Sequence, residues 1–316
     1  MKKLITLAAC CALALGAAAC GDDNDDSSAN ADSSSGDTQL SGNVKIDGSS
    51  TVAPFAQAAQ EAFQAENPDV KITVGTSGTG GGFEKFCAGE TDISNASRPI
   101  KDDEEVPVCE KAGIKYKEVQ VANDGIAVVS NPELKVDCLT TAELKKVWNQ
   151  GSKVKTLSEV NPKLPDTELS LFGPGTDSGT FDFFTDVING EEGVSREDYQ
   201  PSEDDNILVQ GVTGEAGGFG YFGHSYYEQN QDKLNLIKVD GGDGCIEPTT
   251  ETIQSGEYKP LSRPIFMYPS TKALQRPEVK AFLDYILENQ QAIAEASQIV
   301  PMNTQQTDEA KTALGS

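Results

Sequence analysis

Four short stretches rich in serine, threonine and glycine hold the residues of this chain that are best suited to chemistry. They are residues 47–51 (DGSST), 75–82 (GTSGTGGG), 95–98 (NASR) and 177–180 (DSGT). At least three of them precede segments with helical spacing of apolar residues, so their free backbone N–H groups would point at whatever lies between them. Hydroxyl groups add hydrogen-bond donors, and Arg98 adds a full positive charge. This combination predicts a binding site for a small oxyanion such as phosphate or sulfate.

An exported enzyme that uses the same stretches to hold a phosphoryl group is the main alternative. Ser178 could act as a nucleophile, but the chain has a single histidine, His224, to serve as its base. The glycine stretch lacks the Gly-Lys-Ser/Thr ending of a nucleotide-binding loop. A phosphatase would also need a metal cluster, a cysteine nucleophile or an acid–base pair that contains histidine. We therefore predict a binding protein without catalytic residues, metal or cofactor.

The chain is strongly acidic, with 316 residues and a formal net charge of −25 at pH 7. Such a charge makes binding to nucleic acid or to anionic lipid unfavourable, so we expect no nucleic-acid partner. It does not exclude an anion site, because salt screens surface charges beyond about 10 Å. A desolvated site depends instead on the donors that line it. We expect the protein to be a monomer.

The start of the chain resembles a bacterial lipoprotein signal. A basic start and a short apolar run over residues 4–15 precede small residues and Cys20. The match is imperfect, because Ala17 stands where such signals usually carry a large aliphatic residue. We expect residues 1–19 to be a signal peptide and Cys20 to carry a lipid such as palmitate; simple secretion is the alternative.

The segment that follows predicts a tether. Residues 21–40 contain six aspartates, many serines and almost no apolar side chains. Such a composition cannot bury enough surface to offset the entropy lost on ordering. We therefore expect residues 20–41 to be a flexible acidic tether. It would hold the folded body at the extracytoplasmic face of the cell membrane, or the body would lie free in the periplasm.

Four cysteines remain in the body of the chain: Cys87, Cys109, Cys138 and Cys245. None has the Cys-x-x-Cys spacing of a zinc or redox motif. Two disulfides are the usual state in an oxidising compartment, and the sequence allows three pairings. We favour Cys87 with Cys109 and Cys138 with Cys245, because the first pair closes a local loop. Free buried thiols are the alternative.

Strands and helices alternate along the first part of the body. Residues 43–46 and 70–74 predict strands, and the helix between them would be capped by Ser50 or Thr51. The glycine stretch would precede a helix that begins at Phe83. The polar stretches would then lie at the carboxyl ends of strands, where open α/β sheets bind ligands.

Two long apolar runs, residues 118–131 and 262–268, predict extended strands that cross between two lobes as a hinge. The first run would be broken at residues 123–125. Closing helices are expected at 277–287 and 290–298, so that one lobe is assembled from both ends of the chain. Between the crossings we expect helices over 140–148, 180–188 and from 225, with strands over 169–172 and 218–222.

Five motifs follow one another in an order that points to a family. They are residues 46–54 (IDGSSTVAP), 76–83 (TSGTGGGF), 92–99 (DISNASRP), 177–180 (DSGT) and 260–265 (PLSRPI). From about Asn43 onward the chain resembles the PstS family of phosphate-binding proteins, which serve phosphate ABC transporters. The resemblance implies a two-lobed α/β periplasmic-binding-protein fold of type II-like form, with mixed sheets flanked by helices and two crossing hinge strands.

The resemblance also implies where the lobes lie and what they do. Lobe 1 would comprise residues 42–124 plus 263–316, and lobe 2 residues 125–262. Hinge closure would trap inorganic phosphate and present it to ABC permease subunits. A broader oxyanion receptor, which would also accept sulfate, is the alternative. The family's ligand-binding positions fall on Ser50, Thr51, Ser77, Ser178, Gly179 and Thr180.

Two positions depart from the family's best-known pattern. Ser97 stands where many members carry an acidic residue that accepts the proton of phosphate, and Arg98 follows it. Residues 173–175 stand where those members carry an arginine. We expect Ser97 and Arg98 to bind the ligand and Arg98 to supply the positive charge.

The chain then needs another proton acceptor if it is to favour phosphate. Asp124 in the hinge is our choice, with Asp47 and Asp177 as alternatives. A carboxylate would accept a hydrogen bond from phosphate and repel sulfate. Asp124 could instead orient Arg98, and we expect Arg263 to be a structural residue of the hinge strand.

Overall fold

The computed structural model describes residues 39–315, so the predicted signal peptide, Cys20 and most of the predicted tether lie outside this range. Strands and helices alternate through its first part, as expected. The strands are β1 (Gly42–Gly48), β2 (Val70–Val74), β3 (Ile93–Ala96), β4 (Val119–Ser130), β5 (Cys138–Thr140), β6 (Ser170–Pro174), β7 (Gln200–Ser202), β8 (Gly218–Gly223), β9 (Asn235–Asp240), β10 (Cys245–Ile246) and β11 (Ser262–Pro269).

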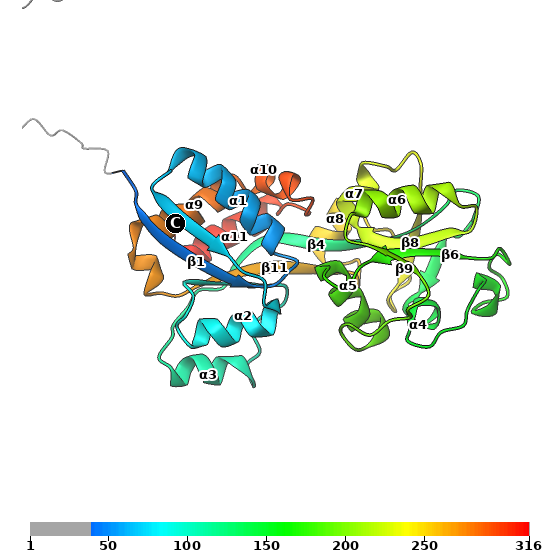
Figure 1. Cartoon of the computed structure of the whole chain (residues 1–316), viewed down its shortest axis with the longest axis horizontal. Helices are drawn as coiled ribbons and strands as arrows, with labels where there is room; N and C mark the ends of the chain where they lie inside the picture. The colour runs from blue at the N-terminus through cyan, green and yellow to red at the C-terminus, as the bar shows by residue number, and fades with distance from the viewer. Residues whose placement is uncertain (1–38, 316) are drawn as a thin grey trace, which may run out of the picture. The chain divides into compact units, whose positions relative to one another are not determined.

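The helices cover the faces of these strands (Figure 1). They are α1 (Ala53–Glu66), α2 (Gly78–Cys87), α3 (Glu105–Lys111), α4 (Thr141–Trp148), α5 (Gly179–Phe184), α6 (Asp205–Gly214), α7 (His224–Glu228), α8 (Thr250–Ser255), α9 (Pro277–Glu288), α10 (Gln290–Ala296) and α11 (Thr304–Leu314). Short helical turns lie at η1 (Leu157–Glu159), η2 (Thr185–Asn189) and η3 (Ala273–Gln275).

Among the described residues, hydrogen bonds join the strands in the order β2-β1-β3-β11-β4-β8-β6-β7, and β9 links β10 and β5 to β4. β1 pairs in parallel with β2 and β3, whereas β11 is antiparallel to both β3 and β4. The sheet is therefore mixed. Together with the flanking helices, this confirms the predicted α/β class.

One hydrophobic core is built from both ends of the described chain. Val44 and Ile46 alternate on the buried face of β1, and Phe55 lies on the buried face of α1. Phe282 of α9 and Met267 of β11 join them from the far end of the sequence. The periods of two and 3.6 residues thus place the apolar positions of strand and helix on facing surfaces. We call this cluster the first core.

A second core is formed almost entirely by the middle of the chain. Its centre is aromatic: the ring of Trp148 meets Tyr221 edge-on with centroids 4.9 Å apart, and Phe184 stacks on Tyr221. Ile126 of β4 and Ile253 of α8 pack against this group. Burial of such large rings contributes much of the packing energy of a domain of this size.

β4 and β11 pass from one core to the other. Val121 of β4 lies in the first core and Val128 in the second, and the two strands run side by side in Figure 1. This confirms the two crossing strands. The expected break at residues 123–125 is wrong, because Asn123 exchanges two backbone hydrogen bonds with Val300 and keeps β4 continuous. The exact lobe boundaries stay a prediction.

Two helix starts differ from expectation. α1 begins at Ala53, after Val52, and neither Ser50 nor Thr51 caps it. α2 begins at Gly78 rather than at Phe83, so most of the glycine stretch is helical. The reason is close packing, since a side chain at Gly82 would overlap the backbone of Gly48 in β1. Glycine here lets a helix lie directly on a strand end.

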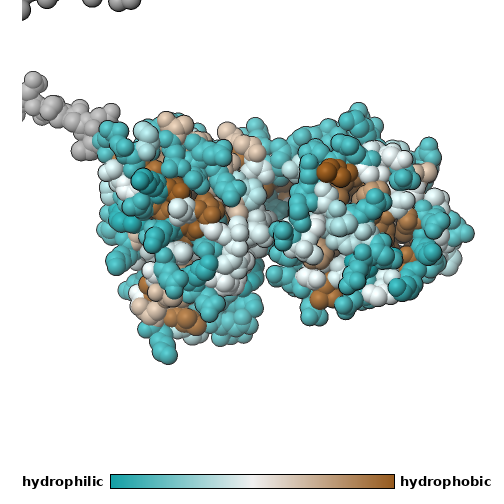
Figure 2. All heavy atoms as spheres, viewed as in Figure 1, coloured by the Kyte–Doolittle hydropathy of each residue, from teal (hydrophilic) through white to brown (hydrophobic). Residues whose placement is uncertain are grey.

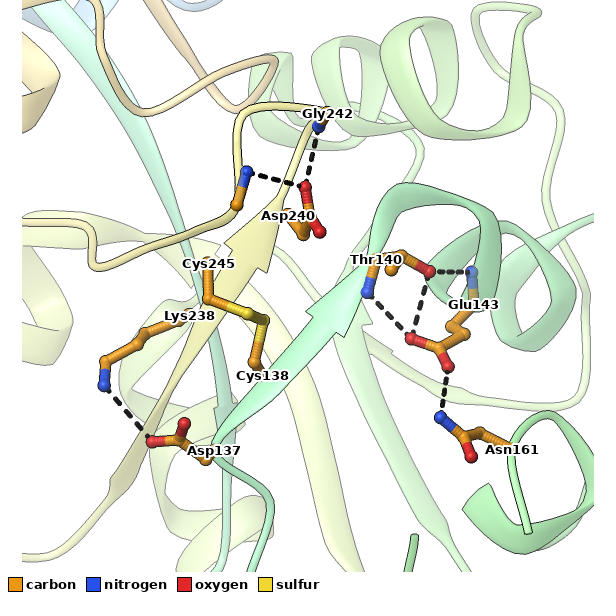
Figure 3. The surroundings of a disulfide bond; sticks show 10 residues. Asp137, Cys138, Thr140, Glu143, Asn161, Lys238, Asp240, Gly242 and Cys245 are labelled. Atoms are coloured by element: carbon orange, nitrogen blue, oxygen red, sulfur yellow. Dashed lines mark hydrogen bonds and ion pairs between the residues drawn. A yellow bond between two sulfur atoms is a disulfide. The ribbon is translucent and has the colours of Figure 1, made fainter. Parts of the chain in front are cut away.

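The two disulfides join Cys87 to Cys109 and Cys138 to Cys245, which confirms the favoured pairing. The first links α2 to α3. The second ties β5 to β10, on either side of β9 (Figure 3). Beside it, Thr140 and Glu143 form reciprocal hydrogen bonds that cap α4. The helix therefore begins where the sequence predicted it.

The surface of the described part is mostly hydrophilic. Figure 2 shows hydrophobic groups separated by hydrophilic ones on the face in view. Val108 and Ile207 are the large apolar side chains that are most exposed among residues 39–315. Within the same range, no helix combines the length and the apolar character needed to cross a bilayer.

Candidate functional site

A pocket of about 680 Å³ lies between the start of α2 and the start of α5. Its wall also includes the segment after β1, the segment after β3 and part of β11. The structure brings six of the predicted site residues to this wall: Ser50, Thr51, Ser77, Ser97, Arg98 and Gly179. Ser178 and Thr180 flank Gly179, and neither they nor Asp124 belong to the wall.

Asp47 holds Ser77 in place at the N-terminal end of α2. Its Oδ1 accepts hydrogen bonds from the backbone N–H and the hydroxyl of Ser77, at 3.0 and 2.7 Å, and Lys85 Nζ lies 2.6 Å from Oδ2. Burial raises the pKa of Asp47, but the hydrogen bonds from Lys85, Ser77 and Gly48 outweigh it and lower the pKa overall. Asp47 is thus an ionised support for Ser77 and does not lie on the pocket wall.

This network predicts a pH-dependent contribution to stability. Asp47→Asn should lower the free energy of unfolding by about 1–3 kcal/mol near neutral pH, because it weakens several charge-assisted hydrogen bonds. The folded-state pKa lies below the unfolded value of 3.8, so the contribution is present above that value and is lost as the pH falls through the folded one. Urea unfolding of wild type and variant from neutral to strongly acidic pH measures it.

The exposed Asp69 offers the matched control, since Asp69→Asn removes a carboxylate that makes no such contacts. A difference between wild type and Asp47→Asn that stays constant down to the most acidic pH would contradict this assignment.

Thr79 is a pocket residue that the sequence did not single out. Its hydroxyl lies 3.0 Å from the hydroxyl of Ser97 and accepts a hydrogen bond from the Ser97 backbone N–H. The only signal was its place inside the glycine stretch, which was expected to be a loop. Because α2 begins at Gly78, Thr79 lies in the first turn of the helix and faces the segment after β3.

Arg98 lies on the wall, but its charge is already paired. Nη1 and Nη2 donate to the two carboxylate oxygens of Glu105 at 2.9 and 2.7 Å, and Nη1 also donates to the carbonyl of Pro99. The hydrogen bonds that Arg98 donates to the carboxylate of Glu105 raise the pKa of Arg98. This partner could not be anticipated from the sequence. About a third of the Arg98 side chain is exposed, so its charge is both neutralised and solvated.

Arg263 is the second guanidinium on the wall and is more deeply placed. Nη2 donates to Thr51 Oγ1 at 2.9 Å and to the carbonyl of Gly179 at 3.4 Å. Nε donates to Asp124 Oδ2 at 3.1 Å, and the group lies 3.7 Å above the ring of Phe183. Burial lowers the pKa of Arg263, and Asp124 opposes this shift. The sequence assigned Arg263 to the hinge alone and missed its position in the pocket.

None of the three expected proton acceptors lies on the wall. Asp124 faces Arg263, Asp47 faces Ser77 and Lys85, and the backbone N–H of Asp177 donates to a carboxylate outside the wall. Three other carboxylates line the pocket instead, and they belong to Asp182, Asp186 and Glu192.

The start of α5 approaches Thr51 very closely. A Cβ at Gly179 would lie 2.6 Å from the backbone nitrogen of Thr51 and nearer still to its hydroxyl. No side chain larger than hydrogen fits at this position without movement. Gly179 therefore allows the strand-end segment after β1 and the start of α5 to meet at one point.

This arrangement can bind an oxyanion through hydroxyl groups, backbone N–H groups and two guanidinium groups. The catalytic alternative finds no matching geometry in the described residues. His224 is buried, its Nε2 lies 2.8 Å from the carbonyl of Pro248, and it is not on the pocket wall. Within residues 39–315, no group of three His, Cys, Asp or Glu side chains is placed to hold a metal ion.

Comparison with known proteins gives consistent matches over most of the chain. Residues 33–290 match a family model described as a PBP superfamily domain. Protein SphX of Synechococcus elongatus is 45% identical over 262 residues, which cover 82% of this chain and 77% of that protein. The phosphate-binding protein PstS of Staphylococcus saprophyticus is 42% identical over 288 residues, which cover 90% and 87%.

A solved structure agrees with these relatives. The crystal structure of a possible phosphate binding protein from Planctomyces limnophilus has a TM-score of 0.82 and 46% sequence identity to this chain. The match covers 87% of this chain and 98% of that one.

Proposed function

The chain belongs to the PstS family of phosphate-binding proteins, the substrate receptors of ABC phosphate transporters, and we propose from this that it captures inorganic phosphate outside the cytoplasm and delivers it to permease subunits. The observation that carries the proposal is Arg263. Its guanidinium group contacts Thr51 and Gly179 on the wall of a pocket that is rich in hydroxyl groups. A half-buried cation beside hydroxyl groups suits an anion that must shed its water.

The proposed ligand-binding set combines the expected residues on the wall with Arg263, which the sequence analysis did not place there, and with the two neighbours of Gly179, which lie off the wall. Asp124 takes the role of holding Arg263 through its Nε, in place of the expected contact with the ligand. Ser178 and Thr180 would reach the ligand only as α5 moves toward it. The set is Ser50, Thr51, Ser77, Ser97, Arg98, Ser178, Gly179, Thr180 and Arg263.

The size of the pocket supports binding by closure. Its volume of about 680 Å³ far exceeds that of a phosphate ion, which occupies only a few water volumes of roughly 30 Å³ each. We propose that lobe 1 (42–124 plus 263–316) and lobe 2 (125–262) approach each other by bending at β4 and β11. Phosphate would favour the closed form, which the permease would recognise.

Gly179→Ala tests the need for close approach at α5. We expect phosphate binding to weaken by about 1–3 kcal/mol, because the added methyl group overlaps Thr51 and holds the two segments apart. Isothermal titration calorimetry measures the loss. Gly80→Ala is the matched control, since Gly80 also lines the pocket and lies in a helix but has open space at its Cβ. Equal affinities for the two variants would refute the steric role of Gly179.

The first residues of the chain and the family support a proposal for where the protein acts and how it is attached. PstS-like receptors work outside the cytoplasm. We propose that Cys20 carries the lipid anchor and that residues 20–41 tether a monomeric body to the membrane. We also propose that the protein binds phosphate without chemical conversion, as its relatives are receptors rather than enzymes.

The test of the function is calorimetric titration of the chain from residue 20 onward, with Cys20→Ser to prevent lipidation. The protein is first freed of bound ligand by partial unfolding and refolding. Tight binding of phosphate with little response to sulfate is the expected result near neutral pH. Comparable binding of sulfate would favour the broader oxyanion receptor, and no response to either anion would refute the proposal.

A further inference from the structure

Asp182 is the carboxylate on the pocket wall that has the most unusual surroundings. It lies on α5 three residues after Gly179, so the two share one face of the helix. Its side chain is half-buried, and no group in residues 39–315 forms a hydrogen bond with its carboxylate. Asp186 and Glu192, the other carboxylates of the wall, are exposed to solvent.

The charged groups around Asp182 act in opposite directions. The pKa of Asp182 is raised to about 6: burial is the main cause, Glu192 and Glu203 add to it, and Arg263 opposes it. The buried phenol of Tyr221 also interacts with this carboxylate, and the exposed Asp186 lies one helical turn beyond it. Arg98 and Lys101 complete the charged groups of the wall. Because this pKa lies below 7, most Asp182 carboxyl groups are ionised at neutral pH. The described residues offer this carboxylate no hydrogen-bond donor.

Phosphate supplies the donor that Asp182 lacks. Near neutral pH phosphate retains a proton, whereas sulfate has none to donate. An ionised carboxylate accepts a short hydrogen bond from a phosphate hydroxyl and repels every oxygen of sulfate. Arg263 interacts electrostatically with Asp182 and lines the same pocket, so that its guanidinium group is available for the unprotonated oxygens of the same anion.

We propose that Asp182 accepts the proton of bound phosphate and thereby sets the selectivity of the site for phosphate over sulfate. The proposal rests on the proposed phosphate site and adds to it a residue that determines specificity. It also places the acceptor on α5, whereas the sequence led us to expect Asp124 in the hinge to replace the acidic residue that is missing at Ser97.

Asp182→Asn is the first test, with phosphate and sulfate titrated into the chain that carries Cys20→Ser. The amide cannot repel sulfate as a carboxylate does, so we expect sulfate to bind more tightly and phosphate less tightly. The dissociation constant for sulfate divided by that for phosphate should fall at least about tenfold. Asp186→Asn is the matched control, because it removes the same charge from the same wall, and its ratio should change by less than about twofold. An unchanged ratio in Asp182→Asn would overturn the proposal.

The wild-type protein provides a second test that does not depend on the folding of a variant. Protonation of Asp182 removes the repulsion, so the affinity for sulfate should rise as the pH is lowered through about 6. The same titration with a folded Asp182→Asn variant, checked by circular dichroism, should show little dependence on pH. A wild-type affinity for sulfate that stays flat across this range would overturn the proposal.

The two sets of titrations separate the proposals from each other. A wild-type protein that does not bind phosphate would refute the proposed function itself. A wild-type protein that binds phosphate, with selectivity unaffected by Asp182→Asn, would refute only the role of Asp182.

Discussion

Arg263→Ala should weaken phosphate binding by at least about 3 kcal/mol, which is more than a hundredfold in the dissociation constant. The substitution removes the deeper of the two guanidinium groups on the wall and leaves Asp124 as a buried carboxylate without its partner. Asp124 would then repel the incoming anion as well. Calorimetric titration with phosphate measures the loss, provided that circular dichroism shows the variant to be folded.

Two variants sharpen this test. Arg98→Ala should cost less, since Arg98 is partly exposed and already paired with Glu105. The double variant Arg263→Ala/Asp124→Asn should recover part of the lost affinity, because it removes the unpaired carboxylate. A larger loss for Arg98→Ala than for Arg263→Ala would restore the assignment made from sequence, in which Arg98 supplies the charge.

Replacing both Cys138 and Cys245 by serine should lower the free energy of unfolding by about 4–5 kcal/mol. The bond spans 107 residues of sequence, and a long loop loses much entropy when it is closed in the unfolded chain. The bond between Cys87 and Cys109 spans only 22 residues, so its removal should cost about 3 kcal/mol. Denaturant unfolding of the two double variants gives both values.

The order of these two losses is the critical result. If the short-range bond proves the more stabilising, the effect does not come from loop closure. The local packing of α2 against α3 would then be the source, and single core substitutions beside Cys87 should reproduce it.

Much of the fold could be predicted because its signals are local. Alternation in β1 and β2 and the helical spacing in α1 and α9 each fall within one element. The helices α3, α6, α8 and α11 were not predicted. Their apolar faces are short, and three of the four hold only one or two buried apolar residues. Packing on the sheet stabilises such helices more than their own sequence does.

The site was predicted only in part, for a physical reason. Ser50, Thr51 and Ser77 follow strand ends, where a sheet exposes polar groups, so their place could be anticipated from order alone. Arg263 and Asp182 become pocket residues only because β11 and α5 meet beside Thr51. Long-range pairing of this kind leaves no periodic mark in the sequence.

The way in which the first core is assembled has a consequence for the synthesis of the chain. Apart from Val300, every buried residue of the second core lies between residues 126 and 261, so that core can form before the chain is complete. The first core needs α9, α10 and α11, the last helices to emerge. Until these helices have been made, the early strands of the first core keep their apolar faces uncovered. Uncovered strands of this kind are prone to aggregate. A chain that crosses a membrane from its N-terminus would carry this half-built sheet until its final residues have passed.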